Sequence, residues 1–132
     1  MANLLIPGLS FSQTRKVTFE DTAAKHGSGL LEVFSTPAMV AFMEQTSLMA
    51  VRNYLEPGFG TVGTNICVSH NRAVSVGKTI ECSATLTRIE GNSLFFDVSV
   101  SDEEGRIGEG THTRYIIDEK RFMKKFIKQN AK

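Results

Sequence analysis

The sequence predicts an α+β fold in which an antiparallel sheet wraps around one long buried helix, with a second helix at the C-terminal end. Three observations lead to this prediction. Residues 37–55 have helical length and are apolar on almost every side, which is typical of a buried helix. Several strand-like segments with tight turns follow, as in an antiparallel meander. Residues 118–128 then carry apolar side chains at helical spacing.

Size and composition favour one globular domain. The chain has 132 residues, 41% hydrophobic and 22% charged, which is close to the globular average. No low-complexity tract, internal repeat or flexible linker interrupts residues 1–132, so we expect a single domain. The formal net charge of +1 is small for a general nucleic-acid binder. No apolar run is long enough to span a bilayer, so we expect neither nucleic acid nor membrane as a partner.

Cysteine usage and the N-terminal residues indicate a cytoplasmic protein. Cys67 and Cys82 lie in separate predicted strands, outside any CxxC motif, and are expected to be buried free thiols of a reducing compartment. Residues 1–9 lack a basic region and break at Pro7-Gly8, unlike a signal peptide. The three histidines match no zinc-site spacing, so we expect no metal site.

The first half of the chain predicts one strand and then the long helix. Residues 15–20 alternate well enough for a strand, with Val17 and Phe19 on one face. Residues 21–29 are turn-like, and residues 30–34 form a short apolar run. The helix starts at Ser35-Thr36-Pro37, where a hydroxyl side chain caps the first turn and proline takes the first helical position.

The second half predicts an antiparallel sheet. The expected strands are residues 60–70, 78–90, 93–102 and 106–117, separated by glycine-containing turns. A sheet wrapped around one buried helix is the hotdog arrangement. In a single small protomer such a sheet covers the helix incompletely, so we expect dimerisation.

Glu44 is the most informative residue of the predicted helix. On a helical wheel its neighbours are apolar, Val40 and Leu48 among them. A lone carboxylate in an apolar stripe is costly unless it is paired or functional. Two interpretations stay open: an active-site carboxylate, or an ion pair or dimer contact with Arg52 or Arg114.

Thr36, His70 and the pair His112 and Arg114 each allow two interpretations. His70 ends a strand whose same-face neighbours are apolar, which fits either a core histidine or a functional one. Thr36 caps the helix, but its hydroxyl also lies beside unpaired backbone N–H groups that favour an oxyanion. His112 and Arg114 share one face of the last strand, which lines a pocket or faces solvent. His26 lies in a glycine-rich loop and is expected to be exposed.

Taken together, several motifs resemble the fluoroacetyl-CoA thioesterase family of hotdog proteins. They are Val33-Phe34-Ser35-Thr36, Glu44, residues 54–58, Gly63-Thr64, Ile66-Cys67-Val68, His70, and Gly110-Thr111-His112 with Arg114. The resemblance extends over residues 15–125. It implies a thioesterase with the catalytic residues Thr36, Glu44 and His70, and a homodimer with active sites at the subunit interface.

The resemblance also implies substrate-binding residues. Gly63 would supply a backbone amide near the substrate carbonyl, with Thr64 beside it, and Arg114 would line the acyl pocket. Phe34 precedes the catalytic threonine, and Leu30 and Gly27 stand where the family carries phenylalanines that gate a pocket selective for the fluorinated acyl group. The departure at this gate favours a more general substrate, a small or medium acyl-CoA.

We therefore expect an acyl-CoA thioesterase in which Glu44 is the base or the nucleophile. Coenzyme A enters as part of the substrate, and no separate cofactor is expected. One alternative is a hotdog dehydratase or hydratase, but those enzymes take a histidine from the loop before the helix, where this chain offers only His26. The other alternative is a non-catalytic acyl-CoA binding module. Thr36 and Glu44 are about 12 Å apart along the helix, which favours a site completed by the partner subunit.

Overall fold

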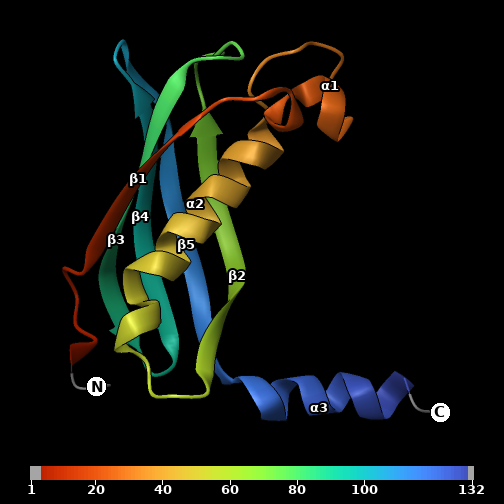
Figure 1. Cartoon of the computed structure of the whole chain (residues 1–132). Helices are drawn as coiled ribbons and strands as arrows, with labels where there is room; N and C mark the ends of the chain where they lie inside the picture. Colours follow the sequence, from red (N-terminus) through yellow and green to blue (C-terminus); the bar gives the residue numbers. More distant parts are fainter. Residues whose placement is uncertain (1–3, 131–132) are drawn as a thin grey trace.

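The computed structural model describes residues 4–130 and contains a five-stranded antiparallel sheet (Figure 1). The strands are β1 Ser10–Lys16, β2 Phe59–His70, β3 Thr79–Glu90, β4 Ser93–Asp102 and β5 Gly105–Asp118. Their order in the sheet is β1-β3-β4-β5-β2. The antiparallel sheet is confirmed, but the predicted four-strand meander is only partly right: β3, β4 and β5 follow one another in the sheet, whereas β2 pairs with β5 and not with β3. β1 and β2 are therefore the two edge strands.

The long helix, α2 Thr36–Val51, lies across the inner face of this curved sheet and ends in a short 3₁₀ turn, Arg52–Tyr54 (Figure 1). Its buried side chains face the sheet: Ala38, Met39, Phe42, Met43, Thr46, Ser47, Ala50 and Val51. Burial of each large apolar side chain contributes about 1.5–3 kcal/mol. The opposite side of α2 is only partly covered within the protomer, because Ala41 and Gln45 are exposed and Glu44 is half-buried. The hotdog fold is confirmed.

The start of α2 corrects the predicted role of one hydroxyl. The N-cap is Ser35, whose Oγ accepts a hydrogen bond from the backbone N–H of Ala38 at 3.1 Å. Thr36 is the first residue inside the helix, and Pro37 follows in the first turn. The expectation that Thr36 caps the helix is wrong. Because Ser35 performs that role, the Thr36 hydroxyl can bond to another side chain.

The first strand was predicted in the wrong place. The strand occupies Ser10–Lys16 and pairs with β3, and the chain leaves the sheet at Val17. The reason is a capping box at the next turn, Phe19–Asp21, where the Asp21 carboxylate accepts from the backbone N–H of Thr18 at 2.9 Å. Val17 is buried at 1% exposure, whereas Phe19 is 47% exposed, so the two do not share a buried face.

A short helix and an exposed loop connect this turn to α2. Helix α1, Ala23–His26, ends at Gly27, whose φ of 73° is the left-handed conformation that glycine adopts without strain. The loop that follows is exposed from Gly27 to Glu32. The segment reaches the beginning of α2, so α1 and the loop lie at the same end of the sheet as the end of β2 (Figure 1).

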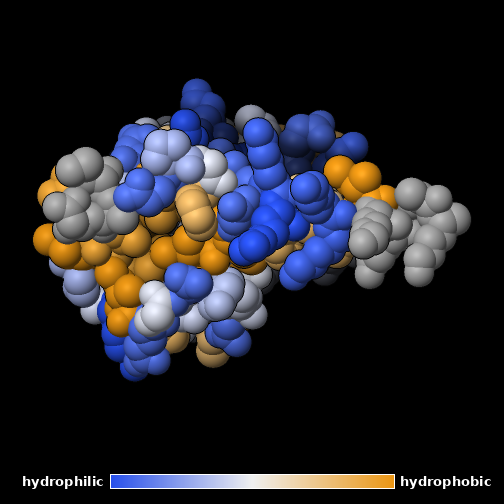
Figure 2. Space-filling view, turned by 90° about the horizontal axis from the view of Figure 1, so that it is seen from below, coloured by the Kyte–Doolittle hydropathy of each residue, from blue (hydrophilic) through white to orange (hydrophobic). Residues whose placement is uncertain are grey.

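The C-terminal helix is confirmed as α3, Glu119–Asn130, and projects away from the sheet (Figure 1). Its apolar stripe is largely uncovered in the protomer, with Met123, Phe126 and Ile127 exposed at 51%, 42% and 65%. Figure 2 shows this end of the molecule, with apolar side chains exposed near the N-terminal segment and on the helix. None of the helices within residues 4–130 has the length and apolarity needed to cross a bilayer.

The two cysteines differ in their surroundings. Both are free thiols, as expected, but only Cys82 is buried, at 0% exposure. Cys67 is exposed on the edge strand β2, so the prediction of two buried thiols is half wrong. Burial raises the pKa of the Cys82 thiol to about 11, which leaves it protonated at neutral pH.

Candidate active site

Thr36 and His70 meet where the first turn of α2 passes the end of β2. The Thr36 hydroxyl oxygen lies 2.9 Å from Nδ1 of His70. The His70 ring packs edge-on against Phe34, with 5.9 Å between ring centroids, and Phe34 is 2% exposed. The structure thus brings together two of the three predicted catalytic residues and one predicted substrate-binding residue.

The second nitrogen of the His70 ring is in an unusual position. Nε2 is buried and has no hydrogen-bond partner within the described residues 4–130. Burial lowers the pKa of His70 below its ordinary value, and a hydrogen bond with the backbone of Arg72 opposes this shift only in part. The imidazole is therefore neutral at pH 7. Buried nitrogens without a partner are uncommon in native proteins, so the structure leaves Nε2 open to a further polar group.

A pocket of about 320 Å³ opens beside Thr36 and His70. Its walls come from α1, from the residues that precede α2, and from residues 71–73 after β2. Ser28, in the exposed loop, also lines it, whereas Leu30 does not. Leu30 is 94% exposed, so within the protomer this predicted substrate-binding side chain points to solvent.

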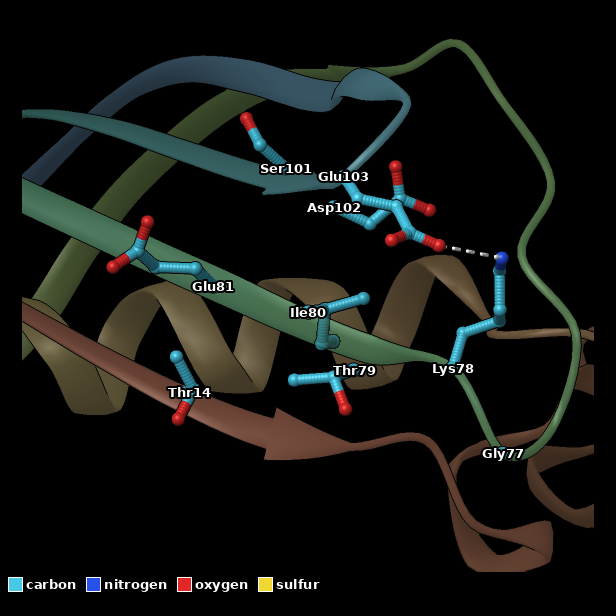
Figure 3. Close-up of a pocket in the computed structure, with 9 residues that line it drawn as sticks. All are labelled: Thr14, Gly77, Lys78, Thr79, Ile80, Glu81, Ser101, Asp102 and Glu103. Atoms are coloured by element: carbon cyan, nitrogen blue, oxygen red, sulfur yellow. Dashed lines mark ion pairs between the residues drawn. The ribbon is translucent and has the colours of Figure 1, made fainter.

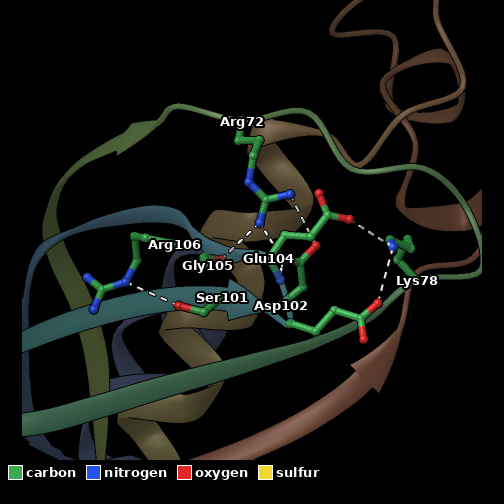
Figure 4. Close-up of polar contacts among 8 residues, drawn as sticks. Arg72, Lys78, Ser101, Asp102, Glu104, Gly105 and Arg106 are labelled. Atoms are coloured by element: carbon green, nitrogen blue, oxygen red, sulfur yellow. Dashed lines mark hydrogen bonds and ion pairs between the residues drawn. The ribbon is translucent and has the colours of Figure 1, made fainter.

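Arg72 ties the segment after His70 to the turn between β4 and β5 (Figure 4). Its guanidinium donates to the Asp102 carboxylate, once at 3.2 Å and once through a closer contact, and to the carbonyl of Gly105 at 2.9 Å. The Arg72 hydrogen bond holds the pKa of the Asp102 carboxyl below its usual range, so the pair stays ionised. This ion pair fixes the chain immediately after His70.

Glu44 lies eight residues beyond Thr36 on α2, about 12 Å further along the helix axis. Within the described residues 4–130, none of the ion pairs involves Glu44. The alternative of an ion pair with Arg52 or Arg114 in the same protomer is therefore wrong. The active-site carboxylate and the dimer contact both stay open.

Arg114 and His112 are buried side by side on the inner face of β5, at 7% and 1% exposure. Arg114 donates from Nε to the Thr61 hydroxyl at 2.7 Å and from Nη2 to the Thr61 carbonyl at 3.0 Å. Its Nη1 lies 3.2 Å from Nε2 of His112, whose Nδ1 lies 2.7 Å from the Asn65 carbonyl oxygen. The interpretation as a solvated face is wrong.

Burial lowers the pKa of both Arg114 and His112, and the negative charge of Glu44 acts in the opposite direction on both. Glu44 is therefore a carboxylate whose charge acts on this buried cluster. The protomer holds two groups of candidate residues on its inner face: Thr36 with His70 at one end of β2, and Glu44 near Arg114 and His112 toward the other end. The sequence did not identify Thr61, which holds Arg114 from the neighbouring strand.

Gly63 and Thr64 lie at a β-bulge in β2, opposite Arg114. A Cβ at Gly63 would lie 3.2 Å from Cε1 of His112 and 3.5 Å from Nη1 of Arg114, so the missing side chain makes room for both. The Thr64 hydroxyl donates to the carbonyl of Thr113 at 3.2 Å, across the irregular register. Gly63 therefore contacts the buried cluster, and Thr64 supports the bulge.

A larger pocket, of about 580 Å³, lies on the outer face of the sheet (Figure 3). Lys78 lines it and pairs with Glu103, while Glu81 adds another exposed carboxylate. None of the predicted site residues lines this pocket. Its acidic lining is unfavourable for a phosphate-bearing ligand. The inner face of the sheet is the better candidate for the active site.

Comparisons with known proteins identify the family and agree with the fold. Residues 17–120 match the family model described as fluoroacetyl-CoA-specific thioesterase. A fluoroacetyl-CoA thioesterase from Streptantibioticus cattleyicolor is 44% identical over 91 residues, which span 69% of this chain and 66% of that protein. A solved structure of the fluoroacetyl-CoA thioesterase FlK superposes with a TM-score of 0.87 at 35% identity, covering 94% of this chain and 96% of that one.

A hot-dog-like protein from Thermanaerovibrio acidaminovorans also superposes with a TM-score of 0.87. It is 24% identical and covers 96% of this chain and 94% of its own, so it supports the fold alone. The family match, in contrast, extends over most of the described residues. The chain belongs to the fluoroacetyl-CoA-specific thioesterase family.

Proposed function

We propose that this thioesterase hydrolyses a small or medium acyl-CoA to the carboxylic acid and free CoA, using Thr36, His70 and Glu44. The observation that supports this most strongly is the hydrogen bond between Thr36 and Nδ1 of His70, with the buried Nε2 left for another polar group. Structures of FlK variants include complexes with acetyl-CoA and with fluoroacetate and CoA. Those ligands suggest a CoA thioester here as well.

The proposed assembly is a homodimer that pairs through β2. This strand has 12 residues and pairs on one side only, with β5, in the described chain. A long unpaired edge is a ready template for another strand. Antiparallel pairing of β2 with its copy around a two-fold axis would join two five-stranded sheets into one.

Such a dimer brings the two groups of candidate residues together. Antiparallel pairing sets the His70 end of β2 against the Gly63 end of the partner's β2, where Glu44 and Arg114 of the partner subunit lie. We propose that the Glu44 carboxylate of the partner subunit meets Nε2 of His70. This arrangement gives the orphan nitrogen an acceptor, and it accounts for the 12 Å gap, about two helical turns, that separates Thr36 from Glu44 within one chain.

The chemistry needs an activated nucleophile and stabilisation of the developing oxyanion. Glu44 either takes the proton of a water that attacks the thioester carbonyl, or attacks the carbonyl itself to form an anhydride that water then hydrolyses. His70, oriented by Thr36, exchanges the proton with Glu44. The Thr36 hydroxyl donates to Nδ1 of His70 and the Gly63 amide polarises the carbonyl. The C–S bond breaks, and CoA leaves as a thiolate that takes up a proton.

Coenzyme A belongs to the substrate, and the proposed chemistry uses no separate cofactor. The proposed location is the cytoplasm, which fits the free thiols Cys67 and Cys82. The uncovered loop at Leu30, where a gating ring was expected, fits a substrate range wider than the fluorinated acyl group.

An acyl-CoA panel tests the proposed activity. Acetyl-, fluoroacetyl-, butyryl-, hexanoyl- and phenylacetyl-CoA are each incubated with the protein while thiol release is followed. Glu44→Ala should abolish turnover, whereas the control Glu81→Ala, at an exposed carboxylate of the outer face, should leave it unchanged. Binding without thiol release by the wild type would favour the acyl-CoA binding module. Hydration of an enoyl-CoA without thiol release would favour the dehydratase.

Turnover in oxygen-18 water separates the two routes. If Glu44 attacks directly and water opens the anhydride at the Glu44 carbonyl, the label enters the Glu44 carboxylate. If Glu44 acts as a base, the label appears only in the released acid. Mass spectrometry of the peptide that contains Glu44, after repeated turnovers, distinguishes these results.

A further inference from the structure

His112 bridges two partners whose chemistry fixes its protonation. Nδ1 lies 2.7 Å from the Asn65 carbonyl oxygen, which can only accept a hydrogen bond. Nε2 lies 3.2 Å from Nη1 of Arg114, which can only donate. Nδ1 therefore carries the proton and Nε2 offers its lone pair. The ring is the neutral Nδ1–H tautomer.

The Arg114 guanidinium is held on three of its nitrogens. Nε and Nη2 donate to Thr61, and Nη1 donates to His112. A guanidinium has five N–H groups, so two remain for other acceptors. Without His112, Nη1 of Arg114 would have no acceptor among these contacts. The guanidinium plane would then be held only by the two bonds to Thr61.

The backbone around this pair is shaped to hold the ring. The register of β2 shifts between Gly63 and Asn65, at the residue whose carbonyl accepts from His112. Gly63 leaves the space that the imidazole occupies, since a Cβ would lie 3.2 Å from its Cε1. The ring also packs against Phe96, with 6.2 Å between ring centroids. These contacts hold His112 in the orientation that places Nε2 beside Arg114.

We propose that His112 is a positioning residue that, as the neutral Nδ1–H tautomer, fixes the Arg114 guanidinium so that its two free N–H groups point at the bound acyl thioester. This inference rests on the proposed function with Arg114 lining the acyl pocket, but the tautomer of His112 and the orientation of Arg114 are properties of the protein alone. Protonation of His112 would replace the acceptor with a second cation and release Arg114. The charged groups that act on His112 are Arg114 on its own strand and Glu44 on α2.

Nitrogen NMR of the wild type tests the tautomer without any substrate. At pH 7 the inference predicts a protonated Nδ1 and an unprotonated Nε2 for His112, with the exposed His26 as a control that shows rapid tautomer exchange. It also predicts that the Arg114 guanidinium signals are resolved because rotation is restricted. A protonated Nε2 at pH 7 would overturn the inference, whether or not the protein hydrolyses any thioester.

A pair of substitutions tests the positioning role. His112→Gln places an amide oxygen near the position of Nε2 and can still accept from Arg114. His112→Asn is too short to do so but can still donate to the Asn65 carbonyl. On the best acyl-CoA of the panel, we expect His112→Asn to lower kcat/KM about tenfold or more, because one hydrogen bond to a charged group is lost. We expect His112→Gln to lower kcat/KM about threefold or less, because that bond is kept.

His26→Asn is the matched control and should leave kcat/KM unchanged. Equal losses in His112→Asn and His112→Gln would overturn the positioning role, because a purely structural effect does not distinguish the acceptor. If neither variant folds, the NMR result on the wild type decides. If the wild type releases no thiol from the whole panel, the proposed function fails. The inference is then tested by NMR: the signals of a restricted Arg114 guanidinium should be lost in His112→Asn and kept in His112→Gln.

Discussion

The hydroxyl of Thr36 lies 2.9 Å from Nδ1 of His70, and this contact joins the first residue of α2 to the last residue of β2. The neighbouring hydroxyl, Ser35, caps the helix instead. Adjacent residues of similar chemistry therefore make different contacts, since Ser35 caps the helix and Thr36 meets the His70 ring. The pair offers a direct way to separate the two effects.

Thr36→Val should reduce activity with little effect on stability. Valine keeps the branched shape but removes the hydroxyl that orients His70, so we expect kcat/KM to fall about 10- to 100-fold. Thr36→Ser keeps the hydroxyl and should retain most of the activity. Steady-state kinetics and thermal melts of both variants check this, and a valine variant with wild-type kinetics would contradict it.

Ser35→Ala should do the reverse. The alanine removes the side-chain acceptor for the Ala38 N–H, which typically costs about 1 kcal/mol of folding free energy. Denaturant unfolding should therefore show a lower midpoint, while kcat stays near that of the wild type. A large loss of kcat without loss of stability would show that the cap and the catalytic hydroxyl are not separated as described.

Stability should fall as the pH drops below the ordinary pKa of histidine. Burial lowers the pKa of His70 and of His112 in the folded protein. The unfolded chain therefore binds protons at these residues more readily than the folded chain does, below about pH 6.5. The free energy of unfolding is therefore highest above that pH. It decreases as the pH falls toward the pKa values of His70 and His112 in the folded protein. Urea unfolding between pH 8 and pH 5 measures this, and His112→Gln should flatten the dependence.

Gly63→Ala should disturb the buried cluster at modest cost in stability. The new Cβ would lie 3.2 Å from the His112 ring and 3.5 Å from Arg114, so these side chains must shift slightly, and overpacking of this kind costs about 1–3 kcal/mol. We expect reduced kcat/KM in a folded protein. Gly108→Ala is the comparison: its Cβ would meet the backbone oxygen of Ser69 at 2.6 Å, which should destabilise the protein more. Equal stability of the two variants would contradict this ranking.

The sequence predicted the elements with strong periodicity and missed those that depend on tertiary contacts. The apolar helix, the four long strands and α3 follow from pattern alone. Strand β1 was misplaced because Ser10–Lys16 is mostly polar, and only pairing with β3 identifies it as a strand. The exposure of Cys67 was missed for a similar reason, since β2 is an edge strand and pattern does not show which strands lie at the edge.

The site could be predicted in part. Thr36, Glu44 and His70 stood out through their positions in apolar or capping contexts and through the family resemblance. The burial of His112 and Arg114 could not be predicted. The alternation of side chains along a strand shows that the two residues share a face of the sheet, but not which face the helix covers. Thr61 carried no signal of its own, since its role depends on the register of β2 against β5, where Thr61 lies two pairs from the bulge at Gly63.

The most direct test of the account mixes two inactive variants. Glu44→Ala and His70→Ala are each prepared alone, then unfolded and refolded together. If the site combines His70 of one subunit with Glu44 of the other, half of the dimers are mixed and each carries one intact site, so about a quarter of wild-type thioesterase activity should return. If the mixture stays as inactive as the separate variants while mixed dimers are shown to form, each site lies within one chain, and the shared active site is wrong.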